Sequence, residues 1–334
     1  MQRALEVSAL AVGIGAVGLL CWHFGLSDVT AALRRVTPGY LGLYLACGCA
    51  ARVGYAVRWQ AVARSLDRSP DLARFVGARL AGDAVSSLLP AGRLGGDPLR
   101  VALLSGEQVS GSRATAGVAI DRVIELIGNM VCAIAYVATF ASVHAAAPSH
   151  APALTLVLTM SVLLVLLAIP LGMLQRGRRL FAPLYGLAAR RGSTWAAALR
   201  RTEEDLITFF RAHPRTFAWG VLGSLAIEAL MVGEFYCLLA AFGLTLDLPT
   251  LLVASVAGGV AHAVPIPGGL GAVEASQVSV LAMATGRPEV GFVVGMVLRL
   301  HESVWVAAGL LALVLQRSSL ARLRLAVAAR KPAL

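Results

Sequence analysis

Two stretches of the chain combine an apolar setting with a density of proline and glycine that a continuous helix does not tolerate. The first is Pro90-Ala-Gly-Arg-Leu-Gly-Gly-Asp-Pro98, and the second is Pro265-Ile-Pro-Gly-Gly-Leu-Gly271. They interrupt the apolar segments 72–110 and 249–286, so each segment is predicted to form two shorter helices. Irregular backbone at membrane depth is tolerated where protein or a wet cavity surrounds it. We therefore predict two helical hairpins that enter the membrane and return to the same side.

The tips of these hairpins are expected at the helix breakers. They are Pro90, Gly92, Gly95, Gly96, Pro265, Pro267, Gly268, Gly269 and Gly271. The first arm of each hairpin counts about 17 residues and the second about 14. Two full crossings by the arms are the alternative, and they would leave the orientation predicted for the other spans unchanged.

The composition places the hairpins in a membrane. Of the 334 residues, 58% are hydrophobic and only 14% are charged, whereas soluble globular proteins have about 25% charged residues. This chain could not cover its own surface with polar groups in water, so it is an integral membrane protein. The net charge is +11, but the sequence contains no polar domain that could present a basic face to nucleic acid. This argues against a nucleic-acid-binding protein.

Six further apolar segments are long enough to cross a bilayer as helices. They are 4–26, 39–63, 114–143, 153–174, 215–242 and 290–316. The first begins like a signal peptide but is longer and lacks a small-x-small cleavage site, so we expect it to be retained. The predicted fold is an all-α polytopic membrane protein, one transmembrane domain over 1–334, with six full spans and two re-entrant helical hairpins.

The distribution of arginine predicts the orientation in the membrane. The stretch 175–215 contains nine Arg, and the tail from Arg317 to Lys331 contains five basic residues and no acidic one. Both are expected in the cytoplasm, together with both chain termini. The loop 144–152 carries no Lys or Arg and is expected outside. Arg34 and Arg35 then fall outside as an exception.

The connector 175–214 is predicted to be amphipathic. Its apolar positions at helical spacing are Trp195, Leu199, Leu206 and Phe210, opposite Arg200, Arg201, Glu203 and Glu204. We interpret it as a surface helix on the anionic inner leaflet, and the alternative is a helix that docks a partner.

An internal repeat relates the two broken segments. A shift of 177 residues, without a gap, superposes matching residues of the two segments and of the spans that follow them: Gly82 and Gly259, Pro90 and Pro267, Gly92 and Gly269, Asp97 and Glu274, Arg122 and Arg299, Glu125 and Glu302. The matches fall on helix breakers and membrane charges, giving repeat A over 39–143 and repeat B over 215–316. By the predicted orientation the two copies are inverted, an architecture associated with alternating access.

Charged side chains within the predicted spans are candidates for function, because a charge at the bilayer centre is costly. Asp121, Arg122 and Glu125 lie on the span after the first hairpin, and Arg299, His301 and Glu302 lie on the span after the second. The Arg-x-x-Glu spacing places each pair on one helix face. The pairs are either neutral structural pins or a site in which arginine binds a headgroup and glutamate balances charge or exchanges a proton.

Three further charges lie at the hairpin tips. Asp97 precedes Pro98 and is interpreted as a helix cap, and Glu274 lies near a helix N-terminus that favours a carboxylate. A cation or proton site is the alternative for both. Arg93 lies inside the first cluster of Pro and Gly, where a guanidinium beside exposed N–H groups predicts an anion site.

Two more arginines, Arg52 and Arg58, lie in the span 39–63, and Glu228 and Glu234 lie in its repeat mate. We predict cross-pairs between these two helices, with snorkelling of Arg58 to the membrane surface as the alternative. The sequence does not distinguish a structural from a functional role for Asp83.

Motifs of soluble enzymes are missing from the sequence: it has no nucleophile elbow, P-loop, dinucleotide loop or zinc motif. The five cysteines lie in apolar stretches without metal-ligand spacing. We therefore expect no catalytic residues, no cofactor and no metal.

Three motifs give the chain a family resemblance. They are Leu89-Pro-Ala-Gly-Arg-Leu-Gly-Gly-Asp-Pro-Leu-Arg100, Ile120-Asp-Arg-Val-Ile-Glu125 and Pro265-Ile-Pro-Gly-Gly-Leu-Gly-Ala-Val-Glu-Ala275. Over nearly the whole chain they resemble the lysylphosphatidylglycerol synthase transmembrane family, flippase-like proteins of the bacterial inner membrane. The resemblance implies translocation of a lipid with a polar headgroup between leaflets. The aminoacyl-transfer domain of full-length synthases has no counterpart before Leu334, so its activity is not carried over.

The expected function is that of a flippase or transporter for a lipid with an anionic headgroup. Arg93, Arg122 and Arg299 would bind the headgroup, and Asp97, Asp121, Glu125, Glu274 and Glu302 would balance charge or couple protons. The alternatives are a membrane subunit of a lipid-modifying enzyme and a secondary transporter of a small soluble ion or metabolite. Membrane lipids are the expected partners, with a second copy of the chain or a separate lipid-modifying enzyme as a protein partner.

Overall fold

The computed structural model describes residues 37–66, 70–89, 95–106, 109–143, 150–190, 195–264, 266 and 269–316. Within these ranges every regular element is a helix. The expected first span 4–26, the residues Arg34 and Arg35, and both chain termini lie outside the described residues.

Five helices are long and apolar enough to cross a membrane: α2 (Pro38–Leu66), α5 (Gly111–Val143), α6 (His150–Gln175), α9 (Pro214–Ala241) and α12 (Pro288–Leu315). They match five of the six predicted spans within a few residues. Three of them, α2, α9 and α12, begin at a proline, which is well suited to the first turn of a helix. The chain is therefore a multi-pass, all-helical membrane protein.

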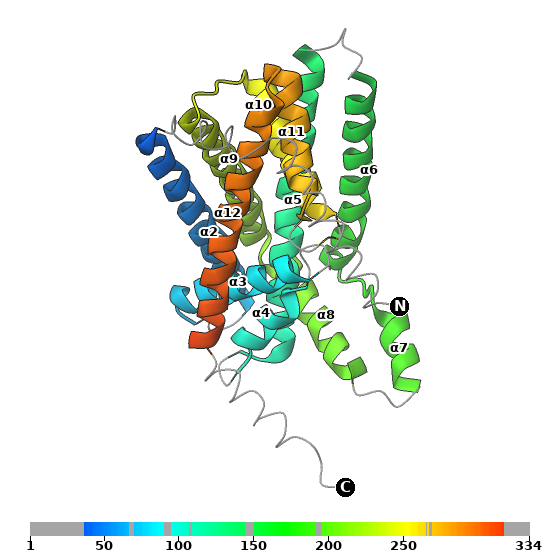
Figure 1. Ribbon diagram of the computed structural model, residues 1–334. Helices are drawn as coiled ribbons and strands as arrows, with labels where there is room; N and C mark the ends of the chain where they lie inside the picture. The colour runs from blue at the N-terminus through cyan, green and yellow to red at the C-terminus, as the bar shows by residue number, and fades with distance from the viewer. Residues whose placement is uncertain are drawn as a thin grey trace.

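The outer face of α6 shows how the bundle meets its surroundings. This helix lies at the edge of the bundle (Figure 1) and leaves Leu158, Val165 and Ile169 more than half exposed. Exposed apolar side chains of this density on one helix mark a lipid-facing surface.

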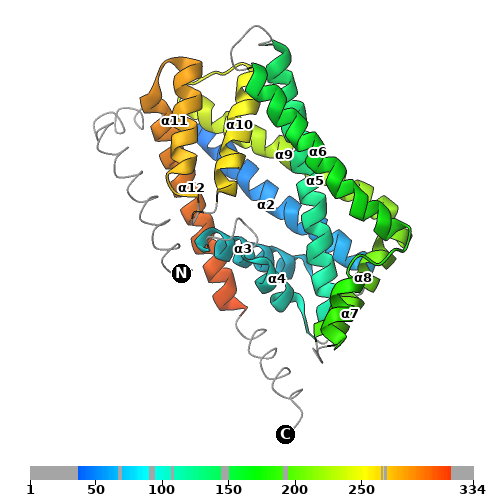
Figure 2. The same ribbon diagram turned by 90° about the vertical axis from the view of Figure 1, so that its right-hand side faces the viewer.

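Each broken segment forms two short helices with the break where the sequence predicts it. The first contains α3 (Leu72–Leu88) and α4 (Asp97–Leu104), and the second contains α10 (Leu248–Ala263) and α11 (Ala272–Thr285). The two helices of each segment pack against each other. In Figures 1 and 2 the first segment lies toward the lower end of the bundle and the second toward the upper end.

The second arm of the first segment is shorter than predicted. Helix α4 has 8 residues where about 14 were expected, because the chain turns at Ser105 and Gly106 before α5 begins. At a rise of about 1.5 Å per residue, α4 is only about 12 Å long.

Close backbone contact joins α3 to α4 and explains one of the tip glycines. A Cβ added to Gly96 would overlap the carbonyl oxygen of Gly82, and the Gly96 N–H donates to Ser86 Oγ at 2.9 Å. In the second tip, Gly269 and Gly271 have φ of 62° and 78°, a left-handed conformation that favours glycine.

The Gly96→Ala variant is expected to lose about 1–3 kcal/mol of stability, because the methyl group meets backbone that has no room to move. Gly42 of α2 is the matched control, since a Cβ there meets no described atom within 4 Å. Thermal unfolding of the purified variants in detergent measures the difference. Equal unfolding temperatures for Gly96→Ala and Gly42→Ala would show that the contact carries no strain.

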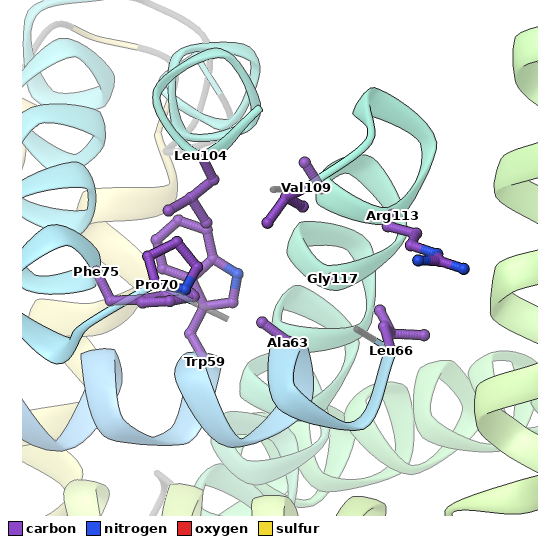
Figure 3. Close-up of a pocket in the computed structure, with 10 residues that line it drawn as sticks. Trp59, Ala63, Leu66, Pro70, Phe75, Leu104, Val109, Arg113 and Gly117 are labelled. Carbon is purple, nitrogen blue, oxygen red and sulfur yellow. The ribbon is translucent and has the colours of Figure 1, made fainter. Parts of the chain in front are cut away.

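Three apolar clusters hold the helices together, and one of them supports the first segment. There Trp59 of α2 meets Phe75 of α3 edge-on, with ring centroids 5.0 Å apart. Figure 3 shows these side chains beside Leu104 and Gly117, around a void of about 10 Å³. A space of that size holds one water at most, so it is a packing defect and not a binding site.

The connector forms α7 (Ala182–Arg190) and α8 (Trp195–Ala212). The apolar face of α8 packs largely on the bundle, where Leu206 and Phe210 are buried in one cluster with Ile124 of α5. Glu203, predicted on the polar face, is buried and accepts the Phe181 N–H at 2.6 Å. That prediction was wrong because α7 and its preceding turn cover this side of α8.

Candidate functional site

A cluster of eight charged side chains fills the space between α2, α3, α4 and α5. We name it the first charge cluster, and its members are Arg58, Arg79, Asp83, Asp97, Arg100, Asp121, Arg122 and Glu125. Four arginines meet four carboxylates, so the cluster is formally neutral. A neutral cluster of buried charges avoids most of the cost of an isolated ion inside the helix bundle.

Arg58 and Arg79 form the centre of the first charge cluster. Arg58 donates to Asp121 Oδ1 at 2.8 Å and to Glu125 Oε2 at 3.2 Å. Arg79 donates to the other oxygen of Asp121 at 3.1 Å and to Glu125 Oε2 at 2.9 Å. Both arginine side chains are at most 4% exposed. The two guanidinium groups thereby join α2 and α3 to α5.

Asp97 forms the other end of the cluster. Arg122 donates from Nε and Nη2 to its carboxylate at 2.8–3.0 Å, and Arg100 donates to Oδ1 at 2.9 Å. Arg100 also contacts Asp83. The capping role predicted for Asp97 was wrong, because Gly96 is the N-cap and the Asp97 side chain makes no cap hydrogen bond.

The second charge cluster repeats this arrangement 177 residues later. Its members are His262, Glu274, Arg299 and Glu302. Arg299 donates to both oxygens of Glu274, at 2.9 and 3.2 Å, and to Glu302 at 2.6 Å. The carboxylate of Glu274 is fully buried and also accepts the Gly271 N–H at 2.9 Å, which confirms its predicted place at a helix N-terminus.

The two clusters thus use equivalent residues for equivalent bonds. Arg122 pairs with Asp97 and with Glu125 three residues on, and Arg299 pairs with Glu274 and with Glu302 three residues on. The predicted Arg-x-x-Glu pairs are therefore present in both halves. In the second cluster, His262 Nε2 lies 3.8 Å from Glu302 Oε2.

A large cavity lies beside the two clusters. It has a volume of about 550 Å³ and is lined from α2, α3, α5, α9, α10, α11 and α12, with Met160 from α6. Figure 2 shows α2 running behind α10 and α5, and all three helices contribute side chains to the lining. The volume falls within the usual range of about 300–1,000 Å³ for small-molecule sites. Its charged and histidine residues are Arg52, Arg79, Asp83, Glu228, Glu234, His262, His301 and Glu302.

The predicted headgroup arginines are placed differently from the expectation. Arg122 and Arg299 are held by carboxylates and do not line the cavity. Arg93 lies outside the described residues, as do Pro90, Gly92, Pro265, Pro267 and Gly268.

Arg52 lines the cavity, and its guanidinium group has N–H groups that can still donate hydrogen bonds to a ligand. Its Nη1 donates to the Gly48 carbonyl at 3.1 Å, and its guanidinium lies 4.1 Å from the centre of the Trp305 ring. Its other N–H groups make no further hydrogen bond within the described ranges. The predicted cross-pairs are not formed as expected, since Arg58 pairs with Asp121 and Glu125 instead.

Sequence reasoning did not single out Arg79 or Arg100 as charged residues of the site, although Arg100 ends one of the family motifs. Both lie within a segment that was interpreted mainly through its helix breakers. The spacing of Arg79 four residues before Asp83, and of Arg100 three residues after Asp97, is the signal that could have identified them.

The comparison with known families agrees with this architecture. The sequence model of the family described as Lysylphosphatidylglycerol synthase TM region matches residues 7–309. The chain belongs to this family. No curated protein matches it.

The lysylphosphatidylglycerol synthase TM region covers the helices of both charge clusters except the last six residues of α12. Family membership therefore relates this membrane protein to lipid modification or flipping. Within the described residues, no three side chains of His, Cys, Asp or Glu gather closely enough to hold a metal ion.

Proposed function

We propose that this protein is a flippase or transporter that moves a lipid with a polar, anionic headgroup across the bacterial inner membrane. The observation that carries the proposal is the cavity of about 550 Å³, which combines charged and apolar walls inside a bundle of membrane-spanning helices. A lipid needs both kinds of surface, because its headgroup is polar and its chains remain in an apolar environment.

The predicted inverted repeat supports this function. The two broken segments lie toward opposite ends of the bundle, and the ion pairs of the two clusters correspond at a shift of 177 residues. Helices that break at opposite ends around one cavity are the arrangement of alternating access, in which the site opens to each side in turn. We infer that each broken segment is a re-entrant hairpin and that both approach the cavity.

Arg52 is our candidate for the headgroup ligand in the described part of the chain. A guanidinium with available N–H groups binds a phosphate through charge-assisted hydrogen bonds. Stacking on Trp305 orients Arg52 without using those groups. We assign Arg122 and Arg299 to support, since each fixes the helix break of its own half against the following span.

Transport by purified protein in vesicles of phosphatidylethanolamine and phosphatidylglycerol tests this function. Fluorescent phosphatidylglycerol is added, and dithionite then measures the fraction that has changed leaflet. The Arg52→Gln variant is expected to slow translocation at least about tenfold, the effect of losing a hydrogen bond to a charged group. Arg200→Gln is the control, because Arg200 lies exposed on α8.

Two outcomes would contradict the proposal. Translocation no faster than in protein-free vesicles would exclude flippase activity, and uptake of soluble glycerol phosphate alone would indicate a transporter of small anions. Mass spectrometry of the recovered lipid covers the enzyme alternative. We expect an unchanged lipid, and a modified headgroup would identify a transferase.

A further inference from the structure

A third polar group in the wall of the cavity contains no arginine, unlike the two charge clusters. His301 of α12 places Nε2 3.3 Å from Oε1 of Glu234 on α9. The two side chains are 8% and 12% exposed, and both line the cavity. They are thus shielded from bulk solvent but open to the space in which a headgroup would move.

Glu234 is distinguished by its partner. The six carboxylates that belong to the two charge clusters each contact at least one arginine. Glu234 has His301 as its only ion-pair partner within 4.0 Å among the described residues. An arginine keeps its charge at every physiological pH, whereas a histidine gains and loses a proton in that range. The Glu234–His301 pair can therefore change its charge by one, and the arginine pairs cannot.

The backbone of α2 leaves room for this pair. A Cβ at Gly48 would lie 2.7 Å from Glu234 Oε1 and 3.1 Å from His301 Cε1. Tyr44, one turn earlier, packs its ring against the imidazole with centroids 4.6 Å apart. The pair therefore lies against the backbone of Gly48, where a larger residue would not fit, and the imidazole packs on the ring of Tyr44.

Trp305 connects this pair to Arg52. Its indole Nε1 donates to His301 Nε2 at 2.5 Å, and the guanidinium of Arg52 lies over its ring at 4.1 Å. His301 Nε2 is therefore an acceptor in this arrangement. When Nε2 takes up a proton it becomes a donor to Glu234, and the indole N–H loses its acceptor. Protonation would thus release Trp305, the side chain on which Arg52 rests.

We propose that Glu234 and His301 form a proton-binding site and that proton uptake there is coupled to binding of the headgroup at Arg52. The coupling rests on the proposed function, whereas the proton site does not. One proton from water in the cavity adds to His301 Nε2 and is shared with Glu234 Oε1. The wall then gains one positive charge, which favours an anionic headgroup.

Among the described residues, few other titratable or charged groups lie near the Glu234–His301 pair. Tyr44 and Arg52 of α2, Cys237 of α9 and Glu302 of α12 interact electrostatically with the pair. Behind them, Cys47 interacts with Cys237, Asp83 with Arg52, and His262 of α10 lies 3.8 Å from Glu302. Of these, Asp83 and Glu302 are already paired with arginines. The change of charge is therefore assigned to the Glu234–His301 pair.

The fluorescence of Trp305 tests the proton site without any transport. An imidazolium beside an indole quenches it, so the signal of the purified full chain in detergent is expected to fall as the pH is lowered from about 8 to about 5. Subtraction of the Trp305→Phe curve isolates this residue. The transition should be absent from His301→Gln, and Glu234→Gln should lose it or move it out of this range. If Trp305 fluorescence in His301→Gln depends on pH as it does in the wild type, the proposed proton site is wrong.

A pH gradient across the vesicles tests the coupling. With one proton per lipid, each unit of gradient should change the steady-state ratio of fluorescent phosphatidylglycerol between leaflets by up to about tenfold. Glu234→Gln and Gly48→Ala should lose this change, and Arg200→Gln should keep it. Wild-type translocation with a ratio independent of the gradient would overturn the coupling alone. No wild-type translocation at all would instead overturn the proposed function and the coupling with it, while the fluorescence titration still decides the proton site.

Discussion

The Arg299→Met variant is expected to lose about 3–5 kcal/mol of stability, the usual cost of leaving a buried charge without its partner. Glu274 is fully buried, and Arg299 is its only arginine partner among the described residues. Methionine keeps much of the side-chain volume and removes the charge, so the loss reports on the ion pair. Denaturant unfolding in detergent measures it.

The equivalent variant in the other half, Arg122→Met, should be affected less. Asp97 keeps Arg100, and Glu125 keeps Arg58 and Arg79. The two variants are expected to differ in stability loss because the first cluster has more arginines than the second. The Arg-x-x-Glu spacing cannot cause this difference, because both halves share it. Arg200→Met, on an exposed pair of α8, is the control and should change stability by less than about 1 kcal/mol. A larger loss for Arg122→Met than for Arg299→Met would contradict this account.

The Arg79→Met variant is expected to lose about 1.5–3 kcal/mol, the usual contribution of hydrogen bonds to charged groups, because each of its carboxylate partners keeps another arginine. Arg79 contacts Asp83, Asp121 and Glu125, and its removal leaves the first charge cluster with one excess negative charge. Unfolding in detergent again measures the loss.

A second substitution separates the charge from the packing of Arg79. Adding Glu125→Gln restores the formal neutrality of the cluster, so the double variant should recover about 1–3 kcal/mol relative to the sum of the single effects. Adding Glu204→Gln on the exposed face of α8 should recover nothing. Strict additivity in the first pair would mean that Arg79 acts through packing alone.

The long helices were predictable because their signal is local. An apolar run that begins at Pro38, Pro214 or Pro288 defines a span and its first turn without knowledge of its neighbours. The breaks at the two Pro and Gly stretches were predictable for the same reason. The early end of α4 was not, because apolar content alone does not register a turn at Ser105 and Gly106.

The partners of the membrane charges depend on packing between distant segments, and here sequence reasoning reached only part of the answer. Spacing within one helix correctly paired Arg122 with Glu125 and Arg299 with Glu302. The bonds from Arg58 to Asp121 and from Glu234 to His301 join residues more than 60 positions apart, and no local pattern encodes them. Arg52 acquires its place in the cavity wall in the same way, through Trp305.

The contacts of α12 and α5 restrict how the protein can move. Helix α3 packs on α12, and α10 packs on α5, so each broken segment rests on a long helix from the opposite half of the chain. At one such contact a Cβ on Gly309 would overlap the Leu80 carbonyl oxygen. Two halves that simply rocked apart would have to separate these surfaces. Under the proposed transport function, the bodies that move are therefore expected to combine helices from both halves of the chain, and either half alone would lack a long helix that packs on its broken segment.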